Sequence, residues 1–244
     1  MRTLILFTIT AAMGLSQQTS RTLQFTQLQT PQAFMETATV IRSIGEIRSL
    51  KVEASQKTMA LQGDTGQIAL ADWLFTRLDR LAGSTTTPQA AQLDYRPTQD
   101  SDDIVRVFYF KNAAPLLDLQ KMTTVIRSLT EIPRAFLSNA AGAFVIRGTP
   151  EQMDAANWLF ESLDQSSFVD GITNGHITDS AGENTIHLFS VPRFGSEQEL
   201  QNFASEMRGA AQMKRVYTYY PLRVIAVRGT PAQIEQAARL ASKL

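Results

Sequence analysis

Two phrases of this sequence recur at one constant interval, and this repetition limits the folds that the chain can adopt. The phrase TVIRSIGEI begins at Thr39 and returns as TVIRSLTEI at Thr124. The same interval separates ADWLFTRLD, which begins at Ala71, from ANWLFESLD, which begins at Ala156. Self-similarity at a fixed period is typical of chains built from copies of one structural unit. We therefore expect a repeat protein whose function belongs to the repeated unit.

A third copy follows the first two. RGTPEQ begins at Arg147 and returns as RGTPAQ at Arg228, after a slightly shorter interval. The apolar positions in the closing helix of each copy also align. These aligned sets are Ile68, Met153 and Ile234; Ala71, Ala156 and Ala237; Leu74, Leu159 and Leu240; and Leu78, Leu163 and Leu244. The sequence therefore predicts units at 21–82, 104–164 and 185–244, each just large enough to fold around a small core.

The order of elements is clearest in the second unit. Residues 104–110 are mostly β-branched or aromatic, which predicts a strand. Residues 119–129 carry an apolar stripe at helical spacing. Two short apolar runs, 135–137 and 143–146, follow with a hairpin-sized segment between them. Together with the closing helix, this order predicts an α+β fold of three tandem βαββα units, each a three-stranded sheet with two helices on one face.

The start of each closing helix is marked by clear signals. Thr149 is placed to cap the helix, Pro150 occupies the first helical position, and Gln152 completes a capping box. Gly148 precedes them, and we expect it to let the strand turn into the helix. The same signals recur in the third unit from Gly229 onward.

Three segments lie outside the predicted units. Residues 1–16 place Arg2 before an apolar run that is too short to span a membrane, and small residues follow, so we interpret them as an export signal. Residues 83–103 and 165–184 are rich in small and polar residues and are predicted to be linkers. Their composition does not determine how the units are oriented.

Charge and cysteine content argue against several kinds of function. The chain has 23 Lys and Arg against 23 Asp and Glu, so it offers no overall basic surface for a nucleic acid. It has no cysteine, which excludes disulfides, thiol nucleophiles and thiolate metal sites. An exported chain of this composition must be stabilised by packed cores.

Two motifs recur at fixed places in the unit. A Gly-Thr or Gly-Asp step ends a strand at Gly63, Gly148 and Gly229. The last helix ends in Leu-Asp at Asp79 and Asp164, whereas the third unit reaches its end without an aspartate. With the strand-helix-strand-strand-helix order, these motifs resemble the short N-terminal repeats of secretins, the NolW-like ring-building modules.

The resemblance implies a periplasmic protein of a two-membrane bacterium that acts in protein–protein assembly, because secretin repeats pack side by side in rings and bind inner-membrane partners or substrates. It does not carry over a pore, since a secretin continues into a pore-forming β-domain that this sequence lacks. What it implies for this chain is a stand-alone array or an accessory protein of a secretion or pilus system.

No pattern in the sequence predicts a catalytic or metal site. The histidines, His176 and His187, have no partner at the spacing of metal ligands or of a general base. Glu46 and Glu131 recur, but they occupy equivalent places in different units, unlike the paired carboxylates of an acid–base site. We expect a protein that is not an enzyme and that uses no cofactor or metal.

Repeated arginines and clustered tyrosines are the candidates for contact with a partner. The arginines recur in the first helix or at the end of a strand, where they either mark a contact surface or lay their stems over apolar surface. The tyrosines, with their neighbour Tyr220, are also candidates for contact with a cell-envelope glycan. The candidate residues are Arg42, Arg127, Arg147, Arg228, Tyr217 and Tyr219.

Two functions remain open. The first is a non-catalytic periplasmic scaffold that binds protein through an open sheet face or an edge strand. It is favoured because consecutive apolar residues at 144–146 and 224–227 leave surface that helices on one face cannot cover. The alternative is an exported ligand- or glycan-binding protein with a cleft between units, which requires polar groups of two units to converge. The expected partners are proteins, including other copies of the chain or secretin-type envelope proteins, with no nucleic acid and no membrane span after removal of the signal.

Overall fold

A computed structural model of the chain describes residues 18–84, 94–97, 103–112, 114–166 and 184–243. The predicted export signal at 1–16 lies outside these ranges, as do His176 and most of the two predicted linkers. Within the described ranges the chain forms six α-helices and three antiparallel sheets. The predicted α+β class and its repeated βαββα units are confirmed.

The first unit sets the pattern for the others. Its sheet has the order β1-β3-β2, so the last strand lies in the centre and both neighbours run antiparallel to it. Its elements are β1 (Thr19–Gln24), α1 (Pro31–Gly45), β2 (Ser49–Glu53), β3 (Thr58–Gly63) and α2 (Thr65–Leu78).

The third unit repeats this topology, with the sheet order β8-β10-β9. A short 3-10 helix, Tyr220–Leu222, joins its last two strands. Its other elements are β8 (Thr185–Ser190), α5 (Glu197–Ala210), β9 (Arg215–Tyr219), β10 (Val224–Gly229) and α6 (Pro231–Ala241).

The second unit differs from the prediction by one strand. Its repeated elements are β5 (Ile104–Tyr109), α3 (Leu116–Thr130), β6 (Arg134–Ser138), β7 (Ala143–Gly148) and α4 (Pro150–Leu163). A fourth strand, β4 (Asp94–Tyr95), extends the sheet to the order β4-β5-β7-β6.

Strand β4 lies inside residues 83–103, which the composition predicts to be a linker. The strand is held by two specific contacts. The Asp94 carboxylate accepts from Arg106 Nε and Nη2, both at 2.6 Å. The ring of Tyr95 contacts Trp73 of the first unit, with 5.4 Å between ring centroids. Polar composition therefore concealed a strand that pairs with β5 and makes side-chain contacts with Arg106 and Trp73.

The repeated glutamine links the second helix of each unit to the end of the first helix. Thr149 Oγ1 accepts from Gln152 N and Gln152 Oε1 accepts from Thr149 N, which confirms the predicted capping box. Gln152 Nε2 also donates to Thr130 O at the end of α3, at 3.1 Å. A Cβ atom on Gly148 would lie 2.6 Å from Gln152 Oε1. A side chain at this position would displace Gln152 from its capping contact, which favours glycine here. The backbone of Gly148 is outside the left-handed region, so the turn that the sequence led us to expect does not itself demand glycine.

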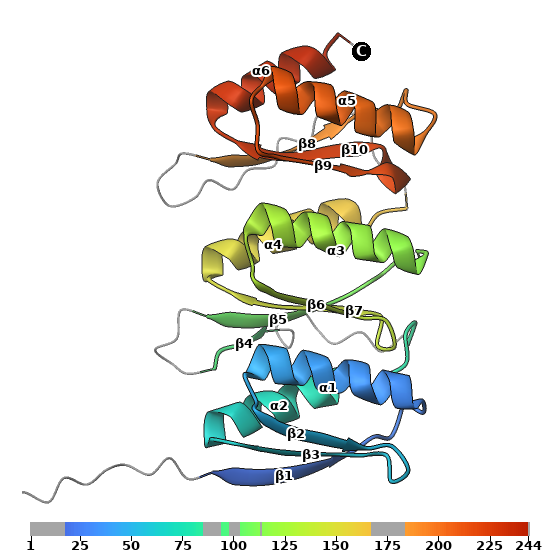
Figure 1. The fold of residues 1–244 in the computed structure, drawn as a ribbon, viewed down its shortest axis with the longest axis vertical. Helices are drawn as coiled ribbons and strands as arrows, with labels where there is room; N and C mark the ends of the chain where they lie inside the picture. Colours follow the sequence, from blue (N-terminus) through green and yellow to red (C-terminus); the bar gives the residue numbers. More distant parts are fainter. Residues whose placement is uncertain (1–17, 85–93, 98–102, 113, 167–183, 244) are drawn as a thin grey trace, which may run out of the picture.

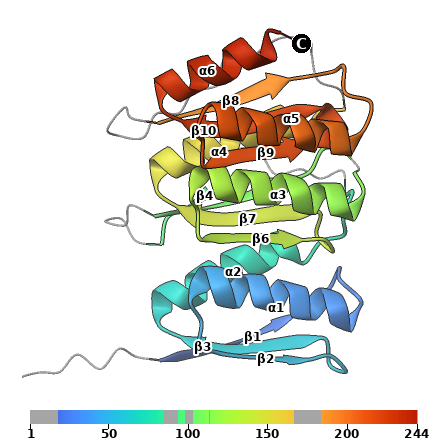
Figure 2. The same cartoon turned by 45° about the horizontal axis from the view of Figure 1, so that its top comes forward.

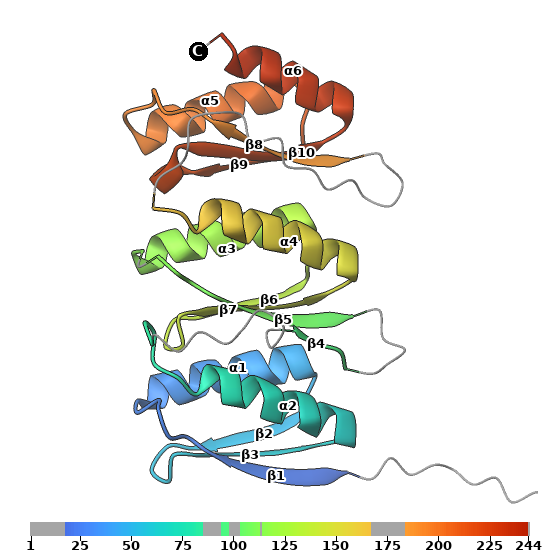
Figure 3. The ribbon, with the colours of Figure 1, turned by 180° about the vertical axis from the view of Figure 1, so that it is seen from behind.

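The three units stack so that sheet layers and helix layers alternate along the molecule (Figure 1). The second sheet lies on α1 and α2, and the third lies on α3 and α4, as the turned and rear views also show (Figures 2 and 3). Each of these two sheets is therefore covered on both faces, by the helices of its own unit and by those of the preceding unit.

The hydrophobic cores cross the boundaries between units. Val105, Val107 and Val145 of the second sheet belong to the core of the first unit. Ile186 and Leu188 of the third sheet belong to the core of the second. Because both faces are buried, the strands need consecutive apolar residues rather than alternating ones. The apolar surface that the sequence leaves uncovered is thus covered by the neighbouring unit.

The outer face of the first sheet is polar. No unit precedes this sheet among the described residues, and its outward positions alternate with the buried Leu23, Met59 and Leu61. The exposed outward residues are Ser20, Thr22, Gln24, Ser49, Lys51, Glu53, Ala60 and Gln62.

The helices at the opposite end of the stack are polar on their outer side. Val40 of α1 and Val125 of α3 are buried against the following sheet, whereas Glu206 occupies the equivalent place in α5 and is exposed. Leu70 of α2 is also buried, and its equivalent in α6 is the exposed Gln236. Both ends of the stack are therefore hydrophilic where the two internal interfaces are apolar.

Candidate functional site

The two internal interfaces carry the same set of charged side chains. At the second interface Glu131 follows α3 in the left-handed conformation, with φ of 58°, and its carboxylate contacts Arg215 and Arg228 of the third unit. Arg228 Nη1 also donates to Leu129 O at 2.8 Å, near the C-terminus of α3, where carbonyl groups lack helical partners. We call Glu131, Arg215 and Arg228 the second clamp.

The first interface repeats this arrangement. Glu46 follows α1 with φ of 55°, and its carboxylate contacts Arg134 and Arg147 of the second unit. Arg147 Nη1 donates to Ile44 O at 3.0 Å, and Arg147 Nε donates to Asp103 at 3.0 Å. We call Glu46, Arg134 and Arg147 the first clamp. The repeated glutamates thus bind the next unit.

The clamp residues are missing at both ends of the stack. In the first sheet, Ser49 and Gln62 occupy the places of the two arginines. After α5, Gln212 adopts the left-handed conformation with φ of 50°, but it has no carboxylate to offer. The charged set therefore occurs only where two units of this chain meet.

We expect Arg228→Met to lower the free energy of unfolding by about 1 to 2 kcal/mol, because it removes an ion pair and a hydrogen bond to a helix C-terminus. The Arg228 side chain is only 14% exposed, so salt screens it less than a free surface pair. Gln62→Met, which introduces methionine at the equivalent position on the outer end, should be nearly neutral. The check is chemical denaturation of both variants, with Glu131→Gln to complete a double-mutant cycle. A coupling energy of zero would contradict the clamp.

The Leu-Asp motif anchors the loop that follows the first strand of its unit. The Asp164 carboxylate accepts from Lys111 N at 2.7 Å and Asn112 N at 3.2 Å. The Asp79 carboxylate accepts from Thr26 N at 2.7 Å and from Leu28 N at 3.0 Å. Both aspartates are buried, so the motif has a structural role.

Asp164→Ala should cost about 2 to 3 kcal/mol of stability, because buried backbone N–H groups lose a charged acceptor. Asp164→Asn keeps one carbonyl oxygen and should cost less. Asp154→Ala, which removes an exposed carboxylate from the same helix, serves as the matched control. Thermal unfolding of the three variants measures the difference, and equal melting temperatures for the two alanine variants would show that the loop is held by other contacts.

The structure places two of the three first-helix arginines against an edge strand of their own unit. Arg42 Nη2 donates to Leu50 O on the edge strand β2, at 3.0 Å. Arg127 is exposed, and no hydrogen bond joins it to the described part of the chain. The sequence comparison missed a third member, Arg208, whose Nη2 donates to Val216 O on edge strand β9 at 2.6 Å. Aligning the first helix of the third unit would have found it.

The tyrosines are less accessible than the sequence predicts. Tyr219 is only 3% exposed and belongs to the core of the second unit. Burial, helped by the charges of Asp118 and Asp164, raises its pKa to about 12. Tyr217 is half-buried against the same core. Tyr219 is therefore not accessible for the contact with a partner or glycan that the sequence suggested, because its sheet is covered by α3 and α4.

His187 is buried in the third unit beside Phe189, and its Nε2 has no hydrogen-bond partner within the described residues. Burial lowers the pKa of His187 below its ordinary value. As the pH falls below about 6.5, the unfolded chain therefore takes up a proton that the folded chain resists, so stability decreases. Stability should become independent of this group once the pH lies below the depressed pKa.

We expect His187→Phe to lose part of the decrease in unfolding free energy between pH 7.5 and pH 5.5. Urea denaturation of both proteins at the two pH values provides the measurement. An unchanged pH dependence would show that His187 is protonated equally in the folded and unfolded chains.

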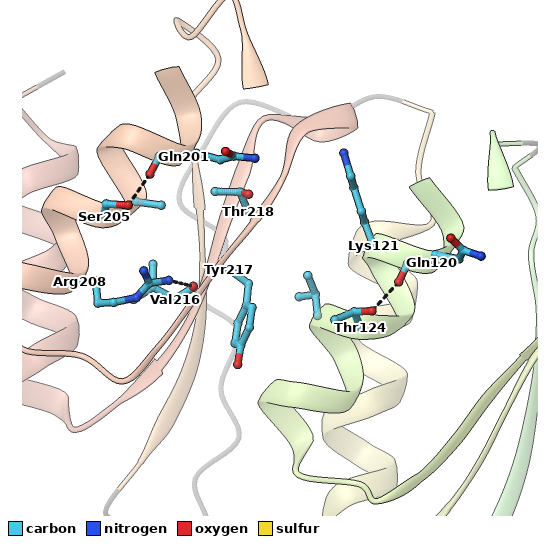
Figure 4. Close-up of a pocket in the computed structure, with 11 residues that line it drawn as sticks. Gln120, Lys121, Thr124, Gln201, Ser205, Arg208, Val216, Tyr217 and Thr218 are labelled. Atoms are coloured by element: carbon cyan, nitrogen blue, oxygen red, sulfur yellow. Dashed lines mark hydrogen bonds between the residues drawn. The ribbon is translucent and has the colours of Figure 1, made fainter. Parts of the chain in front are cut away.

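An open groove of about 470 Å³ lies between the second and third units (Figure 4). Its walls are α3 and α5, and edge strand β9 lies between them. The lining residues are Gln120, Lys121, Thr124 and Val125 of α3, Gln201, Ala204, Ser205 and Arg208 of α5, and Val216, Tyr217 and Thr218 of β9. Polar side chains of two units thus converge, as the ligand-binding alternative requires.

Among the described residues, no group of three or more His, Asp or Glu side chains is arranged to hold a metal ion. No helix in this part of the chain combines the length and the hydrophobicity needed to cross a bilayer. The expectation that the protein lacks enzymatic activity stays a prediction.

No protein-family model and no curated protein matches this sequence. The chain is similar to a protein of unknown function from Aeropyrum pernix, with a TM-score of 0.29 and 13% identity over 61% of this chain and 83% of that chain.

Two other similar structures have longer chains. ExeD of Aeromonas hydrophila matches with a TM-score of 0.22 and 10% identity over 93% of this chain and 41% of its own. The pilotin–secretin complex AspS–GspD of ETEC matches with a TM-score of 0.22 and 11% identity over 93% of this chain and 38% of that chain. This chain spans less than half of either one, and at such TM-scores the matches identify no family and assign no function.

Proposed function

We propose that this protein is a non-catalytic periplasmic scaffold of secretin-N-domain-like repeats, accessory to a secretion or pilus system, which binds other envelope proteins along the flanks of its stack. The observation that carries this proposal is the use of the sheet faces. Both faces of the second and third sheets are buried in contacts within the chain, and the outer face of the first sheet is polar. The flanks, with their edge strands and the groove, are left for partners.

The test is site-specific crosslinking in the native cell envelope. A photoreactive residue replaces Gln201, which lines the groove on one flank, or Ala60 on the outer face of the first sheet. We expect protein adducts from the flank position and few from the end. The chain should also be released with periplasmic contents and should lack residues 1–16. Absence of adducts from the flank position would contradict a scaffold role.

A second candidate function, ligand or glycan binding between units, is favoured by the groove alone. Its half-buried Tyr217 offers an aromatic ring, and Gln120 and Gln201 offer amides from the two helices that form its walls. Co-sedimentation of the mature chain with purified peptidoglycan tests this role. Retention that is lost in Tyr217→Ala would support it, and a chain that stays in the supernatant would contradict it.

A further inference from the structure

The groove between α3 and α5 differs from the corresponding place at the first interface. There Glu36 of α1 accepts from the backbone amides of Asn139 and Ala140, which follow edge strand β6, the second of these bonds at 3.4 Å. Lys121 stands at the equivalent place in α3, and it contacts Glu197 of α5 at 2.6 Å. The residues that follow β9 in the corresponding places are Tyr220 and Pro221, and proline has no backbone N–H. Because a cation cannot accept from an amide, the remaining backbone next to β9 has no acidic partner on α3 like the one found at β6.

Strand β9 presents backbone groups to the groove. Val216 O accepts from Arg208, so this carbonyl points away from the central strand β10. Backbone groups of alternate residues in a strand point the same way, which directs the N–H and C=O of Thr218 outward as well. An outward-facing edge of this kind is a template for pairing with another extended segment.

The charge of the groove selects among extended segments. Lys121 and Arg208 line it from opposite helices, and none of its lining residues is acidic (Figure 4). Glu197 contacts Lys121 from outside the lining and offsets part of this charge. The remaining lining groups are hydroxyls, amides and the ring of Tyr217. The groove is therefore complementary to a segment with acidic side chains.

We propose that the groove binds an extended, acidic peptide segment of a partner protein, which adds as a strand to the outer edge of β9. The backbone of the segment pairs with Thr218, and its carboxylates face Lys121 and Arg208. This inference rests on the proposed scaffold function and specifies one class of partner for it.

The probe is a capped heptapeptide of alternating Glu and Val, titrated into the isotope-labelled mature chain and followed by the amide resonances of β9 and α3. Thr218→Pro removes the outward N–H at a position where an edge strand tolerates proline. Thr218→Val keeps the backbone and is the matched control. We expect Thr218→Pro to weaken binding about tenfold and Thr218→Val to leave it within about twofold.

A helix variant covers the case in which Thr218→Pro fails to fold. Lys121→Glu restores the charge found at Glu36 and should weaken the Glu-Val peptide while improving a Lys-Val peptide. If the parent chain bound the Glu-Val and Lys-Val peptides equally, the inference would be overturned. The same holds if a Glu-Val peptide N-methylated at alternate amides bound as well as the unmethylated peptide. Resonance shifts in the groove caused by chitotriose and unaffected by Thr218→Pro would also overturn the inference, because they would identify a sugar site.

Crosslinking separates this inference from the scaffold proposal. Flank adducts that persist in Thr218→Pro and Lys121→Glu would overturn strand addition and leave the scaffold standing. A parent chain without any adduct would remove the scaffold and, with it, a protein partner for the groove.

Discussion

Replacing Val145 with aspartate is expected to destabilise the protein by at least about 4 kcal/mol, because it buries a charge without a partner. Val145 lies in the middle of β7, is fully buried, and packs in the core of the first unit. The charge would separate the second sheet from α1 and α2 or unfold both units. Chemical denaturation measures the loss, and limited proteolysis distinguishes separation from unfolding.

The matched control lies on the outer end of the stack. Ala60 holds the same place in β3 that Val145 holds in β7, since both pair with the middle residues of the flanking strands. Its outward face meets solvent. Ala60→Asp should therefore cost about 1 kcal/mol or less. Equal losses in the two variants would show that the second sheet does not rest on the first unit.

Leu159→Ala should cost about 2 to 5 kcal/mol by leaving a cavity in the second core. Leu159 is fully buried on α4, among residues of both the second and third units. Unfolding followed by tryptophan fluorescence is a suitable measurement, because Trp158 is the adjacent residue and lies at the edge of the same core.

The equivalent leucine of the last unit provides the comparison. Leu240 on α6 is only half-buried, because no sheet covers α6 in the described part of the chain. Leu240→Ala should thus lose clearly less stability than Leu159→Ala. Similar losses in the two variants would mean that Leu240 on α6 is as deeply buried as Leu159 on α4.

The elements of each unit could be predicted because their signals are local. The capping box at Thr149 and Gln152 and the apolar stripe of α3 depend on residues close in sequence, and both are observed. Strand β4 was missed, since its support comes from Arg106 and Trp73, which lie outside its own segment.

The stacking of the units was only partly predictable. The run of apolar residues around Val145 indicated burial on two sides, but it could not say whether the cover was this chain or another. The clamps were missed because the glutamate and its arginines belong to different units. A comparison of repeats shows which residues recur, but it does not show which of them meet across an interface. The informative signal was the exceptions, Gln62 and Gln212, which replace the clamp residues only at the ends.

The hydrophilic ends have a consequence for how copies of this protein can meet. A further copy of the unit, placed on either end, would find neither the apolar cover nor the ionic partners that hold the inner layers together. Copies that associate are therefore expected to contact one another through the flanks of their stacks and not through the ends. The height of such an array would then be one molecule, fixed by the amino-acid sequence and not by the number of copies that join.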